Sequence, residues 1–367
     1  MKGINIRDII RCLEEWAPME YTLPDDNSGL QVGRIDKKAK KVLICLTLTN
    51  QIVEQAIKTK TDLVISHHPL IYKPLRTIAY EEYPSNLIIE LVKNDIVCYS
   101  IHTNLDTAQN GVSYAVAKKL GLRDIKGLIP LENGKLFKLT TFVPKDYLEK
   151  VRTAVCEEGA GIIGEYSYCS FSTSGTGTFL PSEKASPFTG TTGKINEEKE
   201  ERFEVIVPVH KLSRVIDALL ESHPYEEVAY DIYPLYNKNN KISLGVRGNL
   251  EEPTTVEEFS KFVKSKLSVP QIRIAGIMDK EIRTVGIIGG SGGGEIKKII
   301  NCVDLLITGD LKYHQAIESI EMGFTVIDAG HFYTEYPVVE EIKIYLTQKF
   351  PLLEVETFPE IEPFHYI

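Results

Sequence analysis

The sequence contains no apolar run that approaches the roughly 20 residues of a membrane-spanning helix. Its six cysteines are scattered without a Cys-x-x-Cys pair, and several lie inside apolar runs, so we expect reduced core thiols and no disulfide framework. The first residues, MKGINIRDIIRCLEEWAP, carry charges among apolar positions at helical spacing, which predicts an amphipathic surface helix and no signal peptide. These features together predict a soluble, cytoplasmic protein.

Positive charge is also scarce. The chain has 42 Lys and Arg residues against 51 Asp and Glu residues, which gives a net charge of −9. A balance of this sign disfavours a broad surface for nucleic acid or for an anionic membrane, although a local basic patch is compatible with it. We therefore expect neither nucleic acid nor a membrane among the partners of this protein.

The length and the apolar runs predict two domains and an α/β core. A chain of 367 residues is too long for one ordinary hydrophobic core. Helical patterns such as NQIVEQAIKTK and HQAIESIEMG alternate with six nearly continuous apolar runs, which are typical of buried parallel strands. This alternation predicts a layered, mainly parallel sheet built from both ends of the chain. The six runs lie at 41–49, 62–68, 96–103, 284–290, 304–310 and 324–331.

The middle of the chain carries an internal repeat. The segments 143–154 and 207–218 share the pattern V-P-x3-L-x2-V-x2-A, and each follows one predicted strand and leads toward another. Two strand–helix units of this kind predict a ferredoxin-like βαββαβ module of the α+β class. We expect the repeat to pack helices on a sheet and to carry no chemistry.

This predicted module interrupts the α/β core. We place it at 130–243, between the two parts of the core domain at 1–129 and 244–367. Within it, the stretch 172–201 is rich in Gly, Ser, Thr and charge. That composition predicts a long loop, which is able to cover a neighbouring surface.

Two adjacent histidines, His67 and His68, stand where a predicted strand meets Pro69. Neighbouring residues of a regular strand point to opposite faces, so two such histidines rarely bind one metal ion. At a strand end that a proline interrupts, they can diverge and serve two separate ions. By themselves they are equally compatible with one core histidine and one surface histidine.

Two further strand ends carry a histidine followed four residues later by a carboxylate. His102 precedes Asp106, and His331 precedes Glu335. If the chain turns helical after each strand, this spacing places both side chains on one face of the helix. The carboxyl ends of strands line the functional crevice of open α/β sheets. Imidazole and carboxylate groups that meet there from three strand ends predict a metal site.

Other polar groups allow two interpretations each. Asp310, also at a predicted strand end, is a candidate for holding a ligand in place, whereas His314 is either such a residue or an ordinary helix residue. The stretch GIIGGSGGGE (286–295) fits neither GxGxxG nor the P-loop pattern, so it either contacts an anion through backbone N–H groups or allows tight packing. His223 and Glu226 belong either to a turn with solvated charges or to a polar edge that contacts a ligand.

Six separate motifs follow, in order, the pattern of a known family. They are DDNSGLQVG (25–33), ISHHPLIY (65–72), SIHTNLDTAQNGV (100–112), GIIGGSGGGE (286–295), DLLITGDLKYH (304–314) and IDAGHFYTE (327–335). Over essentially its whole length the chain resembles the dinuclear metal centre family named for the NGG-interacting factor three protein, often labelled GTP cyclohydrolase 1 type 2 homologue. Its insert resembles the PII/CutA-like domain of longer bacterial members, in GEYSYCSFSTSGTGTF and HPYEEVAYDIYPL.

The resemblance implies a homohexamer, built as a hollow ring of dimers, with two divalent metal ions in each subunit. Mixed imidazole and carboxylate ligands suit zinc, iron or manganese. The family often has an Asp near the end of its early strand, where this chain has Thr47. Carried over by motif, the metal ligands are His67, His68, Asp106, His331 and Glu335. In a two-metal hydrolase, His102 is the expected proton shuttle unless it is itself a ligand.

Three functions agree with this pattern to different degrees. A two-metal hydrolase acting on a nucleotide or another phosphoester-like small molecule uses the cations to activate water. A regulatory or metal-handling protein binds the same ions without turnover. It differs from a hydrolase because protein ligands fill every coordination position of its metal ions. A nucleic-acid binder agrees with the family name but conflicts with the net charge of −9.

Overall fold

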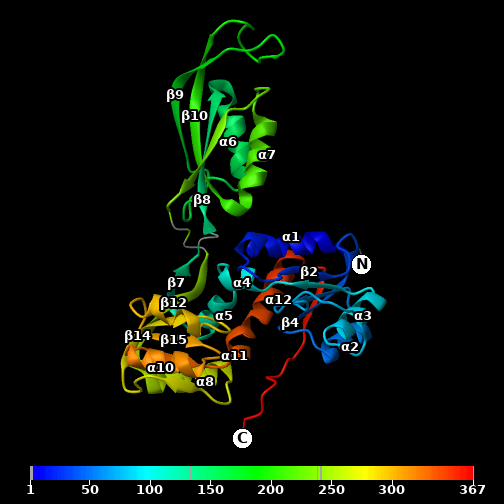
Figure 1. Cartoon of the computed structure of the whole chain (residues 1–367), viewed down its shortest axis with the longest axis vertical. Helices are drawn as coiled ribbons and strands as arrows, with labels where there is room; N and C mark the ends of the chain where they lie inside the picture. Colours follow the sequence, from blue (N-terminus) through cyan, green and yellow to red (C-terminus); the bar gives the residue numbers. More distant parts are fainter. Residues whose placement is uncertain (1–2, 132–133, 238, 240–241, 367) are drawn as a thin grey trace. The chain divides into compact units, whose positions relative to one another are not determined.

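The computed structural model describes residues 3–131, 134–237, 239 and 242–366, and it divides the chain into two compact units. Unit 1 is formed by Met1–Leu131 together with Asn240–Ile367, and unit 2 is formed by Glu132–Asn239. Each unit has its own sheets and its own buried apolar clusters. The elements of unit 2 are drawn in shades of green in Figure 1.

Unit 1 contains a five-stranded sheet in the order β17-β4-β5-β6-β2. The first four strands are parallel, and only β2 runs antiparallel to its neighbour β6. The strands span Gly29–Val32 (β2), Lys41–Cys45 (β4), Leu63–Ser66 (β5), Val97–Ser100 (β6) and Glu354–Thr357 (β17). A two-stranded ribbon of β1 (Ile4–Asn5) and β3 (Lys38–Ala39) also belongs to this unit.

Helices cover both faces of this sheet, which explains why its three central strands, β4, β5 and β6, are mainly apolar and buried. In β4, Val42 and Ile44 pack in the cluster formed with α1 and α12, whereas Leu43 and Cys45 pack in the cluster formed with α2 and α3. Successive strand residues point to opposite faces, so all four must be apolar. The helices span Ile6–Trp16 (α1), Asn50–Lys58 (α2), Ser85–Lys93 (α3) and Pro337–Lys349 (α12).

A second, six-stranded sheet in unit 1 has the order β13-β16-β15-β14-β12-β7. Its three central strands are parallel and its outer strands are antiparallel. Helices α5 (Val112–Lys119) and α8 (Val256–Leu267) cover one face, and α9 (Ile296–Ile299) and α10 (Tyr313–Glu321) cover the other. The strands span Arg123–Pro130 (β7), Ser243–Thr255 (β12), Arg273–Ala275 (β13), Glu281–Ile287 (β14), Leu305–Thr308 (β15) and Thr325–Asp328 (β16).

All six predicted strands of the core are confirmed, but the prediction of one mainly parallel sheet is wrong. Three of the strands belong to each of two sheets, and the apolar pattern did not reveal the other strands, which are antiparallel except for β17. The segment RDIKGLIP of β7 is largely exposed, so it lacks the continuous apolar pattern of a doubly covered strand.

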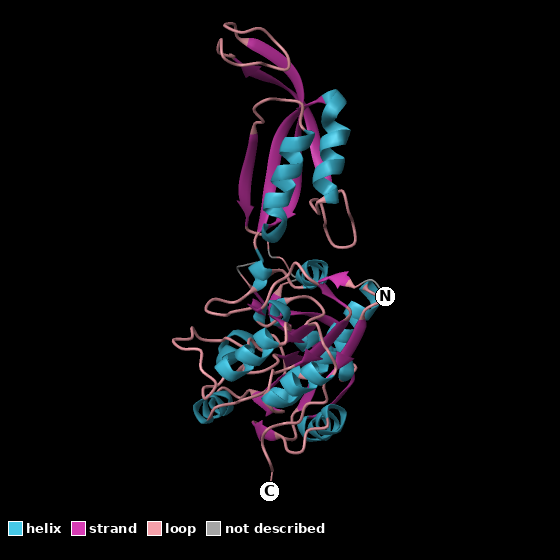
Figure 2. Cartoon of the chain, turned by 90° about the vertical axis from the view of Figure 1, so that its right-hand side faces the viewer, coloured by secondary structure: helices cyan, strands magenta, loops and turns pink. Residues whose placement is uncertain are grey.

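Unit 2 is a four-stranded antiparallel sheet in the order β11-β8-β10-β9. Along the chain, a helix follows the first strand and another follows the third. Helices α6 and α7 lie side by side on one face of the sheet (Figures 1 and 2). The elements span Leu136–Pro144 (β8), Leu148–Glu157 (α6), Ser170–Phe179 (β9), Asn196–Pro208 (β10), Leu212–Ser222 (α7) and Tyr230–Leu235 (β11).

The internal repeat has the architectural role that the sequence predicts. Pro144 and Pro208 each end a strand and lead through a 3-10 turn into a helix. The shared valines, Val151 and Val215, are completely buried between the helices and the sheet. The repeat therefore packs two equivalent helices on one sheet.

The prediction of a long loop at 172–201 is too wide, because the loop is confined to 180–195. The two ends of this stretch belong to strands β9 and β10, which pair from Asn196 with Phe179 to Val205 with Ser170 and extend beyond the helices as a hairpin (Figure 2). Only 180–195 lies between the two strands. Because both faces of much of this hairpin are exposed, its side chains are small or charged, and its backbone pairing leaves no apolar signal in the sequence.

Candidate metal centre

The six site residues predicted from sequence lie together in unit 1. Strands β5 and β6 of one sheet and β16 of the other end at the same place, and short helices follow two of them. These helices are α4 (Thr103–Thr107) and α11 (His331–Glu335). The ring of His68 lies 5.1 Å from that of His67 and 5.5 Å from those of His102 and His331. The carboxyl ends of strands from two sheets therefore meet at the cluster.

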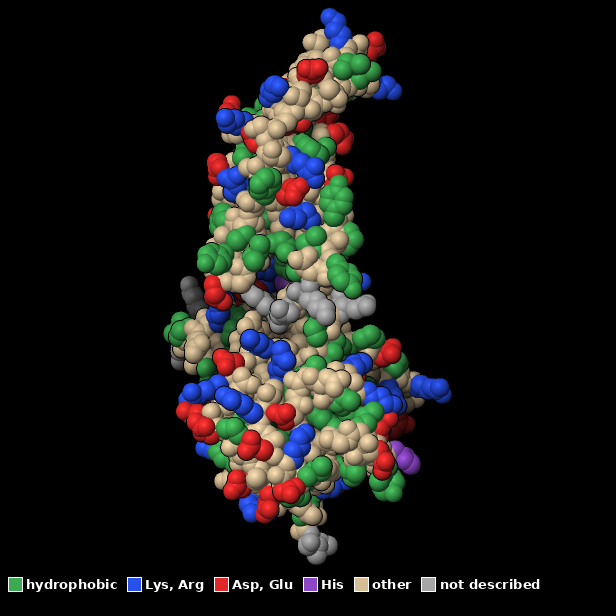
Figure 3. Space-filling view, turned by 90° about the vertical axis from the view of Figure 1, so that its left-hand side faces the viewer, with side chains coloured by type: hydrophobic (Ala, Val, Ile, Leu, Met, Phe, Trp, Pro, Cys, Tyr) green, Lys and Arg blue, Asp and Glu red, His purple; other side chains and the backbone are tan. Residues whose placement is uncertain are grey.

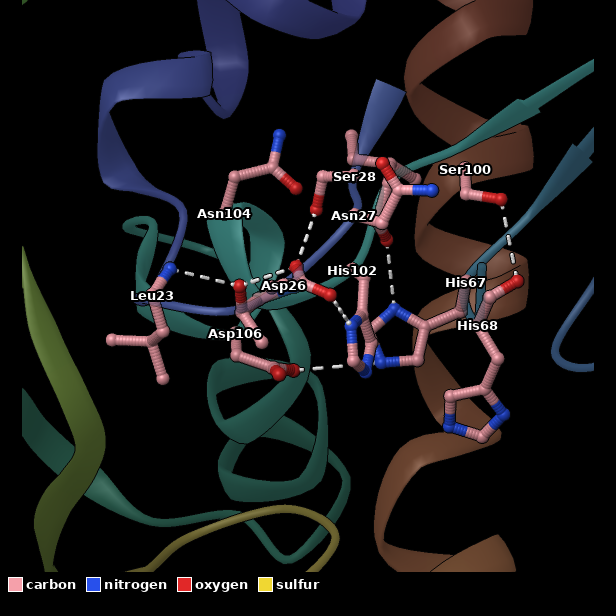
Figure 4. Close-up of polar contacts among 12 residues, drawn as sticks. Leu23, Asp26, Asn27, Ser28, His67, His68, Ser100, His102, Asn104 and Asp106 are labelled. Atoms are coloured by element: carbon pink, nitrogen blue, oxygen red, sulfur yellow. Dashed lines mark hydrogen bonds and ion pairs between the residues drawn. The ribbon is translucent and has the colours of Figure 1, made fainter. Parts of the chain in front are cut away.

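Each histidine of the cluster has a protein partner at its Nδ1 atom. Two partners are carboxylates, one is a hydroxyl and one is a backbone carbonyl, and Figure 4 draws the contacts of His67 and His102. The partner atoms are Ile101 O for His67 (2.8 Å), Thr47 Oγ1 for His68 (2.6 Å), Asp26 Oδ1 for His102 (2.6 Å) and Asp310 Oδ2 for His331 (2.8 Å). Such partners orient the rings and leave the Nε2 atoms available as ligands.

Glu335 joins two of the rings. Its Oε2 atom lies 2.9 Å from Nε2 of His68 and 3.0 Å from Nε2 of His331, and its side chain is 5% exposed. Potential ligand atoms of His68, His331 and Glu335 lie within 4.8 Å of one another, as do those of His67, His68 and His102. The cluster therefore offers two overlapping groups that could bind metal ions, with His68 common to both.

Two buried polar atoms of the cluster have no hydrogen bond among the described residues. They are Nε2 of His67 and Oδ1 of Asp106, which lie 3.5 Å apart (Figure 4). A buried polar atom without a partner costs free energy, so each such atom requires an explanation. Imidazole nitrogen and carboxylate oxygen are both ligands of divalent metals, and the residues present fit such ions.

The ionisation of the cluster suits proton release on metal binding. Burial lowers the pKa of His67 to about 3, so this ring is already neutral. Burial, together with the charge of Glu335, raises the pKa of Asp106 to about 8. Although burial lowers the pKa of His331, its contacts with Glu335 and Asp310 outweigh that effect and raise it to about 9. A metal ion must therefore displace protons from Asp106 and His331 at neutral pH.

Asp26 contacts the cluster, and spacing alone could not reveal this. It lies in the loop before β2 and accepts hydrogen bonds from the hydroxyls of Ser28 (2.7 Å) and Thr103 (2.6 Å) besides its contact with His102. Burial raises its pKa, but these hydrogen bonds outweigh the burial and hold the pKa well below the usual value. Asp26 therefore stays anionic beside His102 (Figure 4). Only the motif DDNSGLQVG indicated its importance.

The C-terminal segment also reaches the cluster. Oε1 and Oε2 of Glu360 accept hydrogen bonds from the backbone N–H groups of Leu46 (2.5 Å) and Thr47 (2.9 Å), just after β4. Thr47 in turn contacts His68, so Glu360 fixes the loop that orients this ring. No sequence signal pointed to Glu360, because it lies far along the chain from β4 and outside the recognised motifs.

We predict that Glu360→Gln weakens metal binding about 10-fold, within the range typical of residues that orient metal ligands. The amide retains one acceptor oxygen but places N–H hydrogens against a backbone donor, so the loop and His68 become less well ordered. Competition with a chromogenic chelator measures the affinity. Ile361→Ala is the control, because that neighbouring side chain is 85% exposed. Equal affinities of Glu360→Gln and Ile361→Ala would contradict the role of Glu360.

The glycine-rich stretch packs against Glu335. A Cβ atom on Gly290 would lie 2.2 Å from Oε1 of Glu335, and Gly290 has a φ of +64°. The backbone N–H of Gly290 donates to Oγ1 of Thr334 (3.1 Å). Of the two interpretations of this stretch, tight packing is therefore supported by direct contacts. His314 is exposed at the start of α10.

We predict that Gly290→Ala weakens metal binding by about 10-fold or more, because the new methyl group must displace the Glu335 carboxylate and the backbone there disfavours a side chain. Gly294→Ala is a matched control in the same stretch, since a Cβ atom there has open space around it. Titration with Zn²⁺ by calorimetry compares the two variants. If both variants bind like the unchanged protein, the Glu335 carboxylate does not need its present position.

Comparisons with known proteins agree with these observations. The family model described as Duf34/NIF3 (NGG1p interacting factor 3) matches residues 4–363. The protein named GTP cyclohydrolase 1 type 2 homolog is 39% identical in Bacillus subtilis and 38% identical in Halalkalibacterium halodurans. Each alignment covers 90% of this chain and 89% of the relative. The crystal structure of a Bacillus cereus protein related to NIF3 matches with a TM-score of 0.89 at 35% identity, with both chains fully covered.

Proposed function

The chain belongs to the Duf34/NIF3 family, and from this premise we propose that it is a dinuclear-metal-dependent hydrolase of nucleotides or other phosphoester-like small molecules. The observation that carries the proposal is the pair of buried ligand atoms on His67 and Asp106, which have no hydrogen bond within the described part of the chain, beside a group formed by His68, His331 and Glu335. Two sets of potential ligand atoms that have His68 in common suit two ions rather than one.

We propose two divalent ions per subunit, of zinc, iron or manganese. Nitrogen and oxygen donors in this mixture suit all three metals. The short distances from Glu335 to two rings and from His67 to Asp106 support the assignment. The proposed ligands are His67, His68, Asp106, His331 and Glu335.

His102 is the proposed proton shuttle. Its Nδ1 atom is held by the anionic Asp26, so its Nε2 atom is the one able to exchange a proton with a substrate. Its side chain is 17% exposed, which leaves it within reach of solvent. When bound, a divalent cation supplies Lewis-acid polarisation of a phosphoryl oxygen and makes water more acidic.

Turnover tests this proposal. Metal-loaded protein should hydrolyse at least one member of a panel of p-nitrophenyl phosphate esters and nucleotides. His102→Asn should lower kcat about 100-fold, the usual contribution of a general acid or base, while retaining its metal. His314→Ala should behave like the unchanged protein. If the fully metal-loaded protein hydrolyses none of these esters and nucleotides, the proposal of a hydrolase is contradicted.

The alternative is a metal-dependent regulatory or metal-handling protein without turnover. The burial of His67 and Glu335 favours it, since closed surroundings are typical of sites that hold a metal without reacting. X-ray absorption spectroscopy of the loaded protein distinguishes the two. A hydrolase retains an exchangeable position on at least one ion, whereas the alternative fills every position with protein ligands.

We also propose that unit 2 is a ferredoxin-like domain of the PII/CutA type, inserted at about 130–243 between 1–129 and 244–367 of the core. Its βαββαβ order and the antiparallel arrangement β11-β8-β10-β9 support this assignment. The pairing of Pro130 with Ser243 at the ends of β7 and β12 supports an insertion, because the chain leaves and re-enters unit 1 at adjacent residues.

We also propose that the protein forms a homohexamer and is located in the cytoplasm. We propose further that nucleic acid is not among its partners. The hexamer rests on family resemblance. The free cysteines, four of them buried, support a reducing compartment. Among the described residues, no helix has both the length and the apolar character that crossing a membrane requires. Lysine and arginine side chains are interspersed with acidic ones on the face in Figure 3, which supports the expectation that nucleic acid is not a partner.

A further inference from the structure

A cavity of about 590 Å³ lies entirely within unit 2, in residues that the metal centre does not use. It lies beside the β9–β10 hairpin, beneath the loop 180–195 and beside the turn that precedes β11. Its volume is in the range of small-molecule sites. Its walls include the aromatic side chains of Phe142, Phe188 and Tyr225.

The loop over the cavity is fixed to the turn on its far side. The backbone N–H of Ser186 donates to Oε2 of Glu226 (2.8 Å). The ring of Phe188 lies 5.5 Å from that of Tyr147 and 6.1 Å from that of Tyr225. These contacts define the wall of the cavity from both sides, so the space is bounded by ordered aromatic and polar groups.

His223 holds the turn rather than a ligand. It is buried, its Nε2 atom lies 3.0 Å from the carbonyl oxygen of Phe142, and its Nδ1 atom accepts from the backbone N–H of Tyr225 (3.2 Å). The sequence around His223 allowed either a turn or a polar edge that contacts a ligand, and the contacts of His223 support the turn. The same contacts orient Tyr225 and the glutamates that follow it toward the cavity.

The charged groups of the cavity wall are mainly acidic. Among the residues that the structure describes, three glutamates line it, at 200, 226 and 227, against one cation, Arg202, which forms an ion pair with Glu204 at 2.8 Å. The hydroxyl of Tyr225 donates to Oε1 of Glu200 (2.8 Å). Oε2 of Glu200 lies against Gly177, where a Cβ atom would be 2.2 Å away. The carboxylate is therefore held in place by Tyr225 and accommodated by a glycine.

We propose that this cavity binds a small organic cation, in which an ammonium group is attached to an apolar or aromatic body. Aromatic faces attract such cations, and carboxylates form strong charge-assisted hydrogen bonds with ammonium N–H groups. The apolar walls contact the body of the ligand, and Glu200 contacts its charged end. This site is separate from the proposed hydrolase and does not depend on it.

Calorimetric titration of the full chain with three compounds of one shape tests the proposal. The probes are 4-phenylbutylamine, 4-phenylbutanol and 4-phenylbutyrate, in the presence of EDTA to exclude binding to metal. We expect the amine to bind at least about 10-fold more tightly than the alcohol, with the carboxylate weaker still. Equal or tighter binding of the alcohol or the carboxylate would overturn the proposal, as would the absence of amine binding at millimolar concentration.

Two variants locate the binding. Glu200→Gln should weaken the amine about 10-fold and leave the alcohol unchanged, because only the charge-assisted contact is lost. Glu197→Gln makes the same charge change on β10 but outside the cavity wall, and it should bind the amine normally. An equal loss in both variants would show a nonspecific charge effect and refute the site. If Glu200→Gln does not fold, Gly177→Ala serves instead, since it displaces the same carboxylate, and normal amine binding by that variant would refute the site.

Discussion

Replacing His68 with alanine is expected to leave the protein with almost no tightly bound divalent metal. His68 is the residue common to both groups of potential ligand atoms, so its loss weakens both. We expect affinity to fall at least about 100-fold, beyond the range typical of residues that only orient ligands. Elemental analysis after dialysis measures the bound metal. His314→Ala, an exposed histidine on α10, is the control for the loss of one imidazole.

Single changes on either side of His68 should separate the two groups. His67→Ala removes a member of one group and His331→Ala a member of the other, so each should lower the metal content by about half if two ions bind. Anomalous diffraction from crystals of each variant shows which position is lost. Unchanged metal content in the double variant His67→Ala/His331→Ala would contradict the site itself.

Glu335→Gln is expected to have the second largest effect, and it changes stability as well as metal binding. In chelated protein at pH 6.5, the variant loses the charge-assisted contacts of Glu335 with His68 and His331. We expect the free energy of unfolding to fall by about 2 kcal/mol, the usual size for hydrogen bonds to a charged group. Urea denaturation followed by circular dichroism measures the change. Metal binding should also weaken, because the variant lacks a carboxylate ligand.

The pH dependence of this effect has a definite sign. The pKa of His331 is raised to about 9, chiefly by Glu335 against the opposing effect of burial. Its stabilisation is therefore complete below the usual value near 6.5 and is lost as the pH rises through about 9. Asp106 also lowers the stability of the folded protein as the pH rises, up to its pKa of about 8, because burial and the charge of Glu335 disfavour its ionised form. The lowered pKa of His67 changes the stability only below pH 6.5, because above that value the ring is neutral in both the folded and the unfolded chain.

We therefore expect the chelated protein to lose stability between pH 6.5 and 9, and Glu335→Gln to lose less. The difference between the two proteins should shrink across this interval, since His331 becomes neutral in both. Denaturation curves at several pH values provide the test. A difference that stays constant from pH 6.5 to 9 would show that the contacts of Glu335 do not depend on the charge of His331.

The strands of the core were predictable because helices cover both of their faces. An apolar run such as KVLICLTLT predicts a strand although apolar and polar residues do not alternate in it, and β4 lies within this run. The division into two sheets was not predictable, because it depends on strands such as β7 that are partly exposed and weakly patterned. The β9–β10 hairpin was missed for the same reason, since its pairing involves backbone groups that every sequence possesses.

The histidines and carboxylates of the cluster could be predicted from sequence more readily than the residues that orient them. A histidine beside another, or four residues before a carboxylate, is visible as spacing, and the structure brings all six of these side chains together. The partners of the rings carry no such pattern. Asp26, Thr47 and Glu360 reach the cluster only through tertiary contacts, so no local periodicity relates them to it.

The wide separation of these groups along the chain has a consequence for biosynthesis. Asp26 lies near the beginning of the sequence and Glu360 near its end, yet both support the same cluster. During translation, early segments leave the ribosome well before Glu335 is synthesised. The nascent chain therefore exposes His67 and His68 without their distant neighbours, and the cluster cannot be complete before Glu335 and Glu360 have been synthesised.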